Sequence, residues 1–302
     1  LHGGSGASDY YNSSLEEAVK RFQEANGLAP TGVVDRRTVA VLTVPAEVRL
    51  KQLRLNLRRL QGLVKLGKKS RYVLVNIPAA QVEAVEDGKV ASRHAGVVGK
   101  PDRATPVLRS TIRELNFNPT WKLPPTVIKE DLIPKGREMY RAGKDVLVTY
   151  GIDAYSGGRK IDPASIDWSS SQPFRLAYRQ APGKDNPLGF VKINFANHYS
   201  VYMHDSPKDS LFGRSLRAAS SGCVRVQNIE ELAAWLLKDK KGWSLDQVKQ
   251  IKESGRTGTA RMKRGVPLYF AYVTAWATED GTVHFRPDLY QKDGVGEVAA
   301  AY

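Results

Sequence analysis

The sequence predicts an α+β protein in which a small helical module precedes a larger, mostly β domain. From residue 71 onward, apolar and polar residues alternate in short runs, which is the pattern of half-buried strands. Before residue 70, apolar residues instead recur at helical spacing between typical capping residues. A chain of 302 residues with 41% hydrophobic residues is long enough for one large and one small domain.

The helical module is expected over residues 13–46. Ser14 to Glu17 has the form of a capping box, and Val19 with Phe22 forms an apolar stripe. The module is expected to be a pair of helices joined by a turn: Gly27 ends the first helix, Gly32 lies in the turn and Asp35 caps the second helix. We interpret residues 1–12 as a disordered lead or an artificial junction that lacks a signal peptide, and we expect a longer precursor to carry the targeting signal or anchor.

A basic amphipathic linker helix is expected over residues 47–69. From Arg49 to Arg71 there are nine Lys or Arg residues and no acid, and leucines recur at helical spacing between them. We expect the basic face to be solvated. The net charge of +15 favours an anionic polymer as partner, but neither zinc-finger spacing nor an RNA-binding aromatic signature indicates nucleic acid. No segment approaches the twenty apolar residues of a membrane span.

The β domain is expected to begin with an alternating strand over residues 71–77. Further extended segments are expected at 81–85, 97–99, 110–112, 190–195 and 266–273. A turn at 86–89 is expected directly after the segment 81–85. Between Trp121 and Gln172 the alternation fails and prolines and glycines accumulate. An insertion of this length is either functional or mobile.

The chemistry centres on Cys223, the only cysteine, which follows Ser220, Ser221 and Gly222 and lies nineteen residues after His204. A strand is expected over residues 197–204, in which the residues on one face are His198, Ser200, Tyr202 and His204. Tyr199, Val201 and Met203 would then point into the core. After Cys223 we expect a helix over residues 228–237, with Asn228 as its N-cap.

A cysteine attacks as its thiolate, and His204 can accept the thiol proton and return it to a leaving amine. The N–H groups of Gly222 and Cys223 are candidate donors to an oxyanion, with Tyr202 as an additional donor. The backbone carbonyl of Asp205 is a candidate for orienting the imidazole. The alternative for a lone cysteine is a small buried hydrophobe.

This pattern resembles the L,D-transpeptidases with a YkuD-type catalytic domain, whose signature is a histidine followed by Ser-x-Gly-Cys-x-Arg. Here these are His204 and residues 220–225. The intervening residues 205–207 and 211–212 look like the large periplasmic YcbB-like branch, and the stretch at 116–125 also resembles one common in these proteins. Many shorter members carry a histidine where this chain has Ser221, so no role of a second histidine is carried over. The resemblance covers residues 70–275, which leaves 276–302 as a C-terminal segment.

The resemblance implies a β-sandwich or barrel with a few helices and a bacterial periplasmic enzyme. It implies that Cys223 attacks a stem tetrapeptide and releases its terminal D-alanine, and that the resulting thioester passes the remaining acyl group to an amine of a second stem, without a cofactor or metal. Carbapenem-type inhibitors and other cell-wall synthases are the further implied partners. The insertion at 121–172 would be a lid, with Met139 and Tyr140 on its inner face; a rigid decoration is the alternative. Ser221 and Arg225 would help to bind substrate, although Arg225 can instead form an internal ion pair.

The N-terminal residues resemble a peptidoglycan-binding module in the order of Phe-Gln at 22–23, Gly-Leu at 27–28, Thr-Gly at 31–32 and Asp35. This resemblance implies glycan strands and stem peptides as partners. Three alternatives remain open at this point: an L,D-carboxypeptidase of the same fold, a non-catalytic wall-binding protein, and a zinc site of His198, His204 and Cys223.

Overall fold

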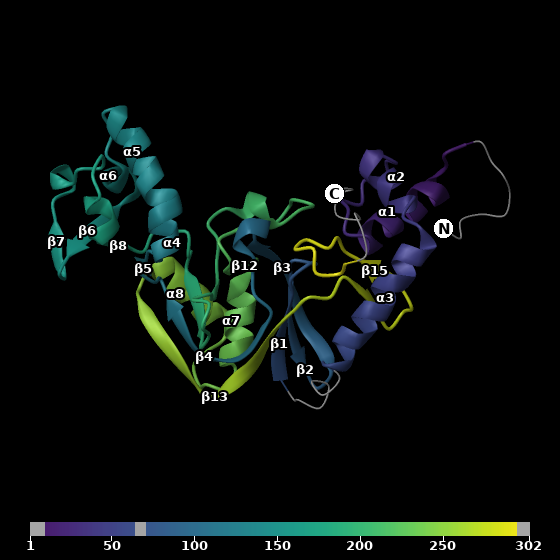
Figure 1. Ribbon diagram of the computed structural model, residues 1–302. Helices are drawn as coiled ribbons and strands as arrows, with labels where there is room; N and C mark the ends of the chain where they lie inside the picture. The colour runs from purple at the N-terminus through teal and green to yellow at the C-terminus, as the bar shows by residue number, and fades with distance from the viewer. Residues whose placement is uncertain (1–9, 64–70, 295–302) are drawn as a thin grey trace. The chain divides into compact units, whose positions relative to one another are not determined.

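The computed structural model describes residues 10–63 and 71–294. Contacts between Cα atoms divide the chain into two compact units, which we describe one at a time (Figure 1). The first unit contains residues 1–110, 210–222 and 267–302, and the second contains residues 111–209 and 223–266. The proposed lead at 1–12 and the end of the proposed linker helix at 64–69 lie largely or wholly outside the described residues.

The N-terminal module is a pair of capped helices, α1 (Ser13–Ala25) and α2 (Arg36–Leu42). Asn12, rather than the predicted capping box, caps α1, because its Oδ1 accepts from the N–H of Leu15 at 2.9 Å. Asp35 caps α2 as predicted, by accepting from the N–H of Thr38 at 2.8 Å. The two helices are joined through the buried amide of Gln23, which donates to Val33 O at 2.8 Å and Thr38 Oγ1 at 3.0 Å.

Helix α3 (Ala46–Gln61) exposes basic residues as predicted, among them Lys51, Arg54 and Arg58, but its leucines do not form the buried face. Leu50, Leu53 and Leu57 are exposed, and Leu57 reaches 60% exposure. The buried face carries the amides of Gln52 and Asn56, which donate to Thr274 O at 3.2 Å and Thr274 Oγ1 at 2.8 Å. These amides satisfy the C-terminal backbone that the helix covers, so hydrogen bonding determines the inward face here.

The strands of the first unit begin with an antiparallel meander of β1 (Arg71–Asn76), β2 (Gln81–Glu86) and β3 (Lys89–Gly99). The end of β13 (Gly258–Ala271) lies parallel to β1, and β11 (Ala218–Ser220) lies parallel to β3. The turn predicted at 86–89 is confirmed, since Asp87 and Gly88 both have positive φ. The hairpin of β14 (Ala275–Ala277) and β15 (Val283–Phe285) crosses the predicted boundary at 275, so the C-terminal segment is part of this unit.

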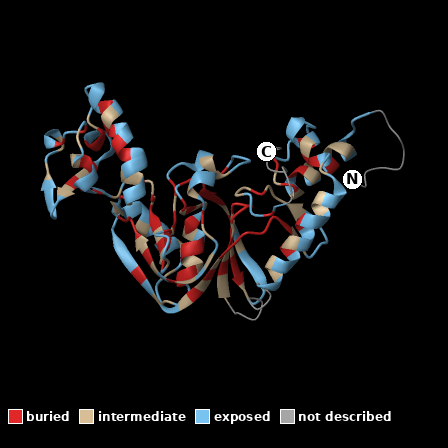
Figure 2. Cartoon of the chain, in the orientation of Figure 1, coloured by how far each residue is buried: buried red, intermediate tan, exposed pale blue. Residues whose placement is uncertain are grey.

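The second unit contains the strands that carry the predicted chemistry. In it, β4 (Leu108–Phe117) from residue 111 onward pairs antiparallel with β9 (Val191–Phe195). Strand β9 pairs antiparallel with β10 (Met203–His204), which pairs parallel with β12 (Val224–Val226). Helices α7 (Ile229–Leu237) and α8 (Leu245–Ser254) complete the unit, and the buried face of α7 is visible in Figure 2. Asn228 precedes α7 as predicted, but it has a φ of 49° and its side chain makes no capping hydrogen bond.

The insertion after Trp121 is a structured subdomain within the second unit. Its sheet has the order β5 (Trp121–Lys122), β8 (Ala177–Gln180), β6 (Ile152–Ser156) and β7 (Arg159–Ile161). Its helices are α4 (Pro125–Val127), α5 (Ile133–Arg141), α6 (Val146–Tyr150) and a π-helical turn at Ile128–Leu132. Pairing of Trp121 with Gln180 closes the segment at its base, eight residues beyond the predicted end at 172.

The insertion also has a hydrophobic core of its own. Trp168 packs so closely on Gly136 that a Cβ there would lie 2.3 Å from the indole. Met139 belongs to this core, whereas Tyr140 is 59% exposed. The predicted pairing of Met139 and Tyr140 on one inner face is therefore wrong, because adjacent helical residues point in different directions. In the described ranges 10–63 and 71–294, no helix is long and apolar enough to cross a membrane.

Candidate active site

Strands β10 and β12 carry the predicted base and nucleophile on adjacent, parallel strands. In their parallel register, Met203 lies opposite Val224 and His204 lies opposite Arg225. The N–H of Val224 donates to Tyr202 O at 3.1 Å, which extends the ladder to the residues that precede both strands. Cys223 therefore lies beside Tyr202 at the start of one strand, and His204 ends the other.

The strand predicted over 197–204 contains only its last two residues. Asn197 holds the preceding chain in a turn, because its Oδ1 accepts from the N–H groups of Tyr199 at 3.0 Å and Val201 at 3.1 Å. Ser200 has a φ of 57°, and Tyr199 is exposed rather than in the core. Such a local side-chain bond competes with strand pairing. The turn places His198 at the surface, away from the predicted face.

Tyr202 is the direct hydrogen-bonding partner of the thiol. Its backbone and its hydroxyl both form hydrogen bonds with Cys223, which act to lower the pKa of the thiol. The Nε1–H of Trp121 donates to the Tyr202 oxygen at 3.2 Å, so the phenol proton is directed to another acceptor. The chain of donors thus runs from Trp121 through Tyr202 to Cys223.

His204 is buried, with 5% exposure, and its Nδ1 lies 2.6 Å from the backbone carbonyl of Asp205. A carbonyl can only accept, so Nδ1 carries the proton and Nε2 is the basic nitrogen. Asp205 is itself fixed, since its N–H donates to Val191 O at 2.9 Å and its Oδ2 accepts from Phe190 N–H at 2.9 Å. Gly189 allows this arrangement, because a Cβ there would lie 2.3 Å from Asp205 Oδ2.

The charges around the site favour a neutral imidazole in the resting protein. Burial and the nearby Arg225 cation lower the pKa of His204 to about 3. Burial raises the pKa of the Cys223 thiol, against the opposing effects of Tyr202, Lys192 and Arg225. Both shifts favour the uncharged form of each group at neutral pH.

Two cations lie at the site. Arg225 donates to Ser206 Oγ at 3.4 Å, and its Nε is a buried donor without a partner among residues 10–63 and 71–294. No carboxylate of the described chain pairs with it, so the internal ion pair considered for Arg225 is absent there. Lys192, which lies opposite His204 in β9, has its ammonium 4.3 Å from the ring centre of Tyr202. Burial lowers the pKa of Lys192, and the thiol of Cys223 acts against this shift.

The loop before Cys223 belongs to the first unit and has its own supports. The N–H of Gly222 donates to Ser220 Oγ at 3.1 Å, so this amide is engaged and does not match the predicted oxyanion donor. Thr105, which is fully buried, donates from Oγ1 to Gly222 O at 2.9 Å. Ser221 is exposed and its hydroxyl accepts from Arg103 at 2.9 Å. Hydrogen bonds thus fix this loop on both sides of Gly222.

Several site residues escaped the sequence analysis. The sequence does contain a signal for Lys192, because the alternation of apolar and polar residues over 190–195 places it on the polar side of its strand. Trp121 was assigned only to the insertion, and nothing in its spacing from Tyr202 indicates their contact. Thr105 and Gly189 also had no signal, because folding alone brings Thr105 to the backbone of Gly222 and Gly189 to the side chain of Asp205.

Two family models match the sequence. The model of the L,D-transpeptidase catalytic domain, YkuD, matches residues 70–259, and the one described as "Putative peptidoglycan binding domain" matches residues 2–42. A Haemophilus influenzae protein named "Putative L,D-transpeptidase" is 36% identical over 223 residues, which are 73% of this chain. The chain spans 44% of the length of that relative.

Solved structures of L,D-transpeptidases are more distant. The Enterococcus faecium enzyme is 13% identical with a TM-score of 0.32, and the alignment covers 67% of this chain and 50% of that chain. The Mycobacterium smegmatis enzyme is 14% identical with a TM-score of 0.32, covering 67% of this chain and 58% of that chain.

Proposed function

Because this chain belongs to the family of L,D-transpeptidases with a YkuD catalytic domain, we propose that it joins peptidoglycan stem peptides. The bond it forms links two diamino acids, and D-alanine leaves the donor stem. The observation that carries this proposal is the arrangement of Cys223 beside Tyr202, with His204 oriented by Asp205 O on the adjacent strand.

In the first step the Cys223 sulfur attacks the carbonyl carbon at the L-centre of the donor diamino acid. His204 Nε2 accepts the thiol proton, and the developing oxyanion receives a hydrogen bond from the Tyr202 hydroxyl. When the C–N bond to D-alanine breaks, His204 returns the proton to the leaving amine. The product of this step is a thioester on Cys223.

In the second step a side-chain amine of another stem attacks the thioester carbon. The new C–N bond forms as the C–S bond breaks, and the amine proton returns to the sulfur through His204. Arg225 Nε is a buried donor that can bind a substrate oxygen, and Lys192 adds positive charge where the thiolate and oxyanion develop.

We propose roles in binding peptidoglycan for the N-terminal module and the insertion as well. The N-terminal module would hold the polymer, and the insertion at 121–180 would close over bound substrate as a lid. We assign the protein to the cell envelope of a bacterium, and more narrowly to the periplasm. Other cell-wall synthases are proposed as partners and carbapenems as acylating inhibitors. This assignment is supported by the two family matches and by the net charge of +15.

Intact-mass analysis of the enzyme with a disaccharide-tetrapeptide tests the proposal, together with mass spectrometry of the products. We expect an adduct on Cys223 in which the donor has lost D-alanine, followed by dimers joined between two diamino acids. Cys223→Ser should show no thioester adduct while keeping its circular dichroism spectrum. Tripeptide alone at high acceptor concentration would indicate a carboxypeptidase, and no adduct at all would indicate a non-catalytic wall-binding protein.

A further inference from the structure

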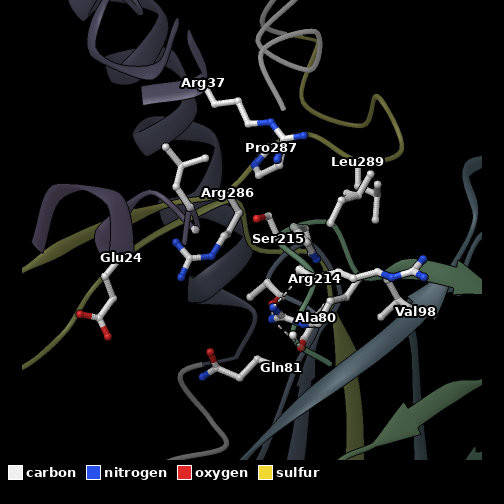
Figure 3. Close-up of a pocket in the computed structure, with 17 residues that line it drawn as sticks. Glu24, Arg37, Ala80, Gln81, Val98, Arg214, Ser215, Arg286, Pro287 and Leu289 are labelled. Carbon is white, nitrogen blue, oxygen red and sulfur yellow. Dashed lines mark hydrogen bonds between the residues drawn. The ribbon is translucent and has the colours of Figure 1, made fainter. Parts of the chain in front are cut away.

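A pocket formed entirely by residues of the first unit has a volume of about 730 Å³. Figure 3 shows that its walls come from separate parts of the chain. The helical module contributes Glu24 and Arg37, the turn before β2 and its first residue contribute Ala80 and Gln81, and the C-terminal segment contributes Arg286. Neither Cys223 nor His204 lines it, so it is separate from the candidate active site.

The pocket is strongly basic. Four arginines line it, at positions 37, 214, 217 and 286, against one carboxylate, that of Glu24. Arg37 and Arg214 are exposed and lie on different segments, α2 and the loop before β11. Cations that converge from separate segments on one concave surface raise the local concentration of anions.

Arg217 is the most informative of these arginines. Among the described residues, its half-buried guanidinium donates to backbone carbonyls alone, which include Gly96 O at 3.1 Å and Ala79 O at 2.9 Å. In the part of the chain that the structure describes, no carboxylate pairs with it, and burial lowers its pKa. A largely desolvated cation without a counter-charge is costly, and a bound anion would offset this cost.

We propose that this pocket binds the carboxylates of a peptidoglycan stem peptide, as a second site in addition to the catalytic one. The inference rests on the proposed function for the identity of the polymer. The volume lies within the range of small-molecule and peptide sites and far exceeds that of a single inorganic ion. The segment matched by the peptidoglycan-binding model supplies part of the wall.

The site would have a definite consequence for the reaction. A stem held there keeps its glycan strand attached while other stems of that strand exchange at Cys223. Tethering of this kind raises the effective concentration of neighbouring stems without new contacts at the active site. The catalytic steps on a short soluble substrate would not depend on it.

The test uses pairs of charge reversals on the full chain. Arg37→Glu and Arg214→Glu change residues that line the pocket, whereas Arg36→Glu changes the exposed neighbour of Arg37 on α2 by the same charge. The enzyme is first acylated with a carbapenem so that its active site is occupied. It is then titrated with disaccharide-tetrapeptide by calorimetry, with thermal unfolding as the folding control.

We expect the acylated wild type to bind one equivalent of the disaccharide-tetrapeptide. The double variant, which combines Arg37→Glu with Arg214→Glu, should bind it at least tenfold more weakly. Arg36→Glu should change affinity less than twofold. Equal binding by the pocket and control variants would overturn the proposal, as would tighter binding of a DNA oligonucleotide of matched charge. If the carbapenem does not acylate Cys223, the proposed function fails, and the same comparison of variants on unmodified protein still decides the pocket.

Discussion

The indole N–H of Trp121 donates to the phenol oxygen of Tyr202 at 3.2 Å. Trp121 is the first residue of the insertion, and Tyr202 forms hydrogen bonds with the Cys223 thiol. One hydrogen bond therefore connects the base of the proposed lid to the residue that supports the proposed nucleophile, Cys223. The two residues are 81 positions apart, and both belong to the second unit.

Removal of this donor should slow acylation. We expect Trp121→Phe to lower kcat/KM for thioester formation about fivefold, the usual cost of one neutral hydrogen bond. Tyr202→Phe removes the hydroxyl itself and should cost more. In the double variant Trp121→Phe should add almost nothing, because its partner is already lost. Additive losses in this cycle, measured by single-turnover mass spectrometry, would contradict the donor chain.

His204 should be the histidine on which turnover depends. We expect His204→Ala to lower kcat by roughly 100-fold to 10,000-fold, the range for general acid–base catalysis. His198→Ala provides the matched control, since His198 lies in the exposed turn after Asn197 and should change kcat less than threefold. Equal losses in the two variants would remove the assignment of His204 as proton carrier.

Gly189 should be required for the orientation of His204. It has a φ of 59°, and an added Cβ would meet the side chain of Asp205, whose carbonyl accepts from His204 Nδ1. We expect Gly189→Ala to lower kcat about tenfold or more while KM changes little. The control is Gly258→Ala in β13, where nothing lies within 4 Å. A kcat that falls equally in both variants would indicate general destabilisation instead.

The buried imidazole should make the protein less stable in mild acid. The pKa of His204 falls from an ordinary 6.5 to about 3 on folding, so the unfolded chain binds more protons between these values. This histidine therefore costs no stability above pH 6.5 and an increasing amount as pH falls below it. Between pH 7.5 and pH 5 the loss is about 2 kcal/mol at most. Denaturant unfolding of wild type and His204→Gln should show a smaller loss in the variant; equal losses would contradict this burial effect.

The parts of the site that sequence predicted are those fixed by local chemistry. Cys223 after Gly222, and His204 at a strand end, follow from residue type and spacing. The strand predicted over 197–204 does not form at residues 197–202, because the side chain of Asn197 accepts from two backbone N–H groups and holds the chain in a turn. Alternation records which residues are apolar, but it does not record this competition for hydrogen bonds.

The same limit explains the errors elsewhere in the fold. Helix α3 was predicted by its leucines, but the residues it buries are Gln52 and Asn56, since the chain at Thr274 needs amide partners. Gly222 was assigned a free N–H, and the side chain two residues earlier occupies it. In both cases a hydrogen bond that residue type alone does not specify decides the outcome, and for α3 its partner comes from the tertiary fold.

The insertion at 121–180 should respond to acylation as a body. It has its own core around Trp168 and Leu147, and its two ends meet in the pairing of β5 with β8. A segment with an internal core can move at its base without unfolding, whereas a simple loop would order residue by residue. Because Trp121 at that base contacts Tyr202, an adduct on Cys223 should alter the closure equilibrium.

We expect carbapenem acylation to slow hydrogen exchange in β5 and in α4, while amides of the internal core around Trp168 change little. Unchanged exchange across 121–180 would favour a rigid decoration, and protection spread evenly over the whole segment would indicate coupled folding instead of movement as a body.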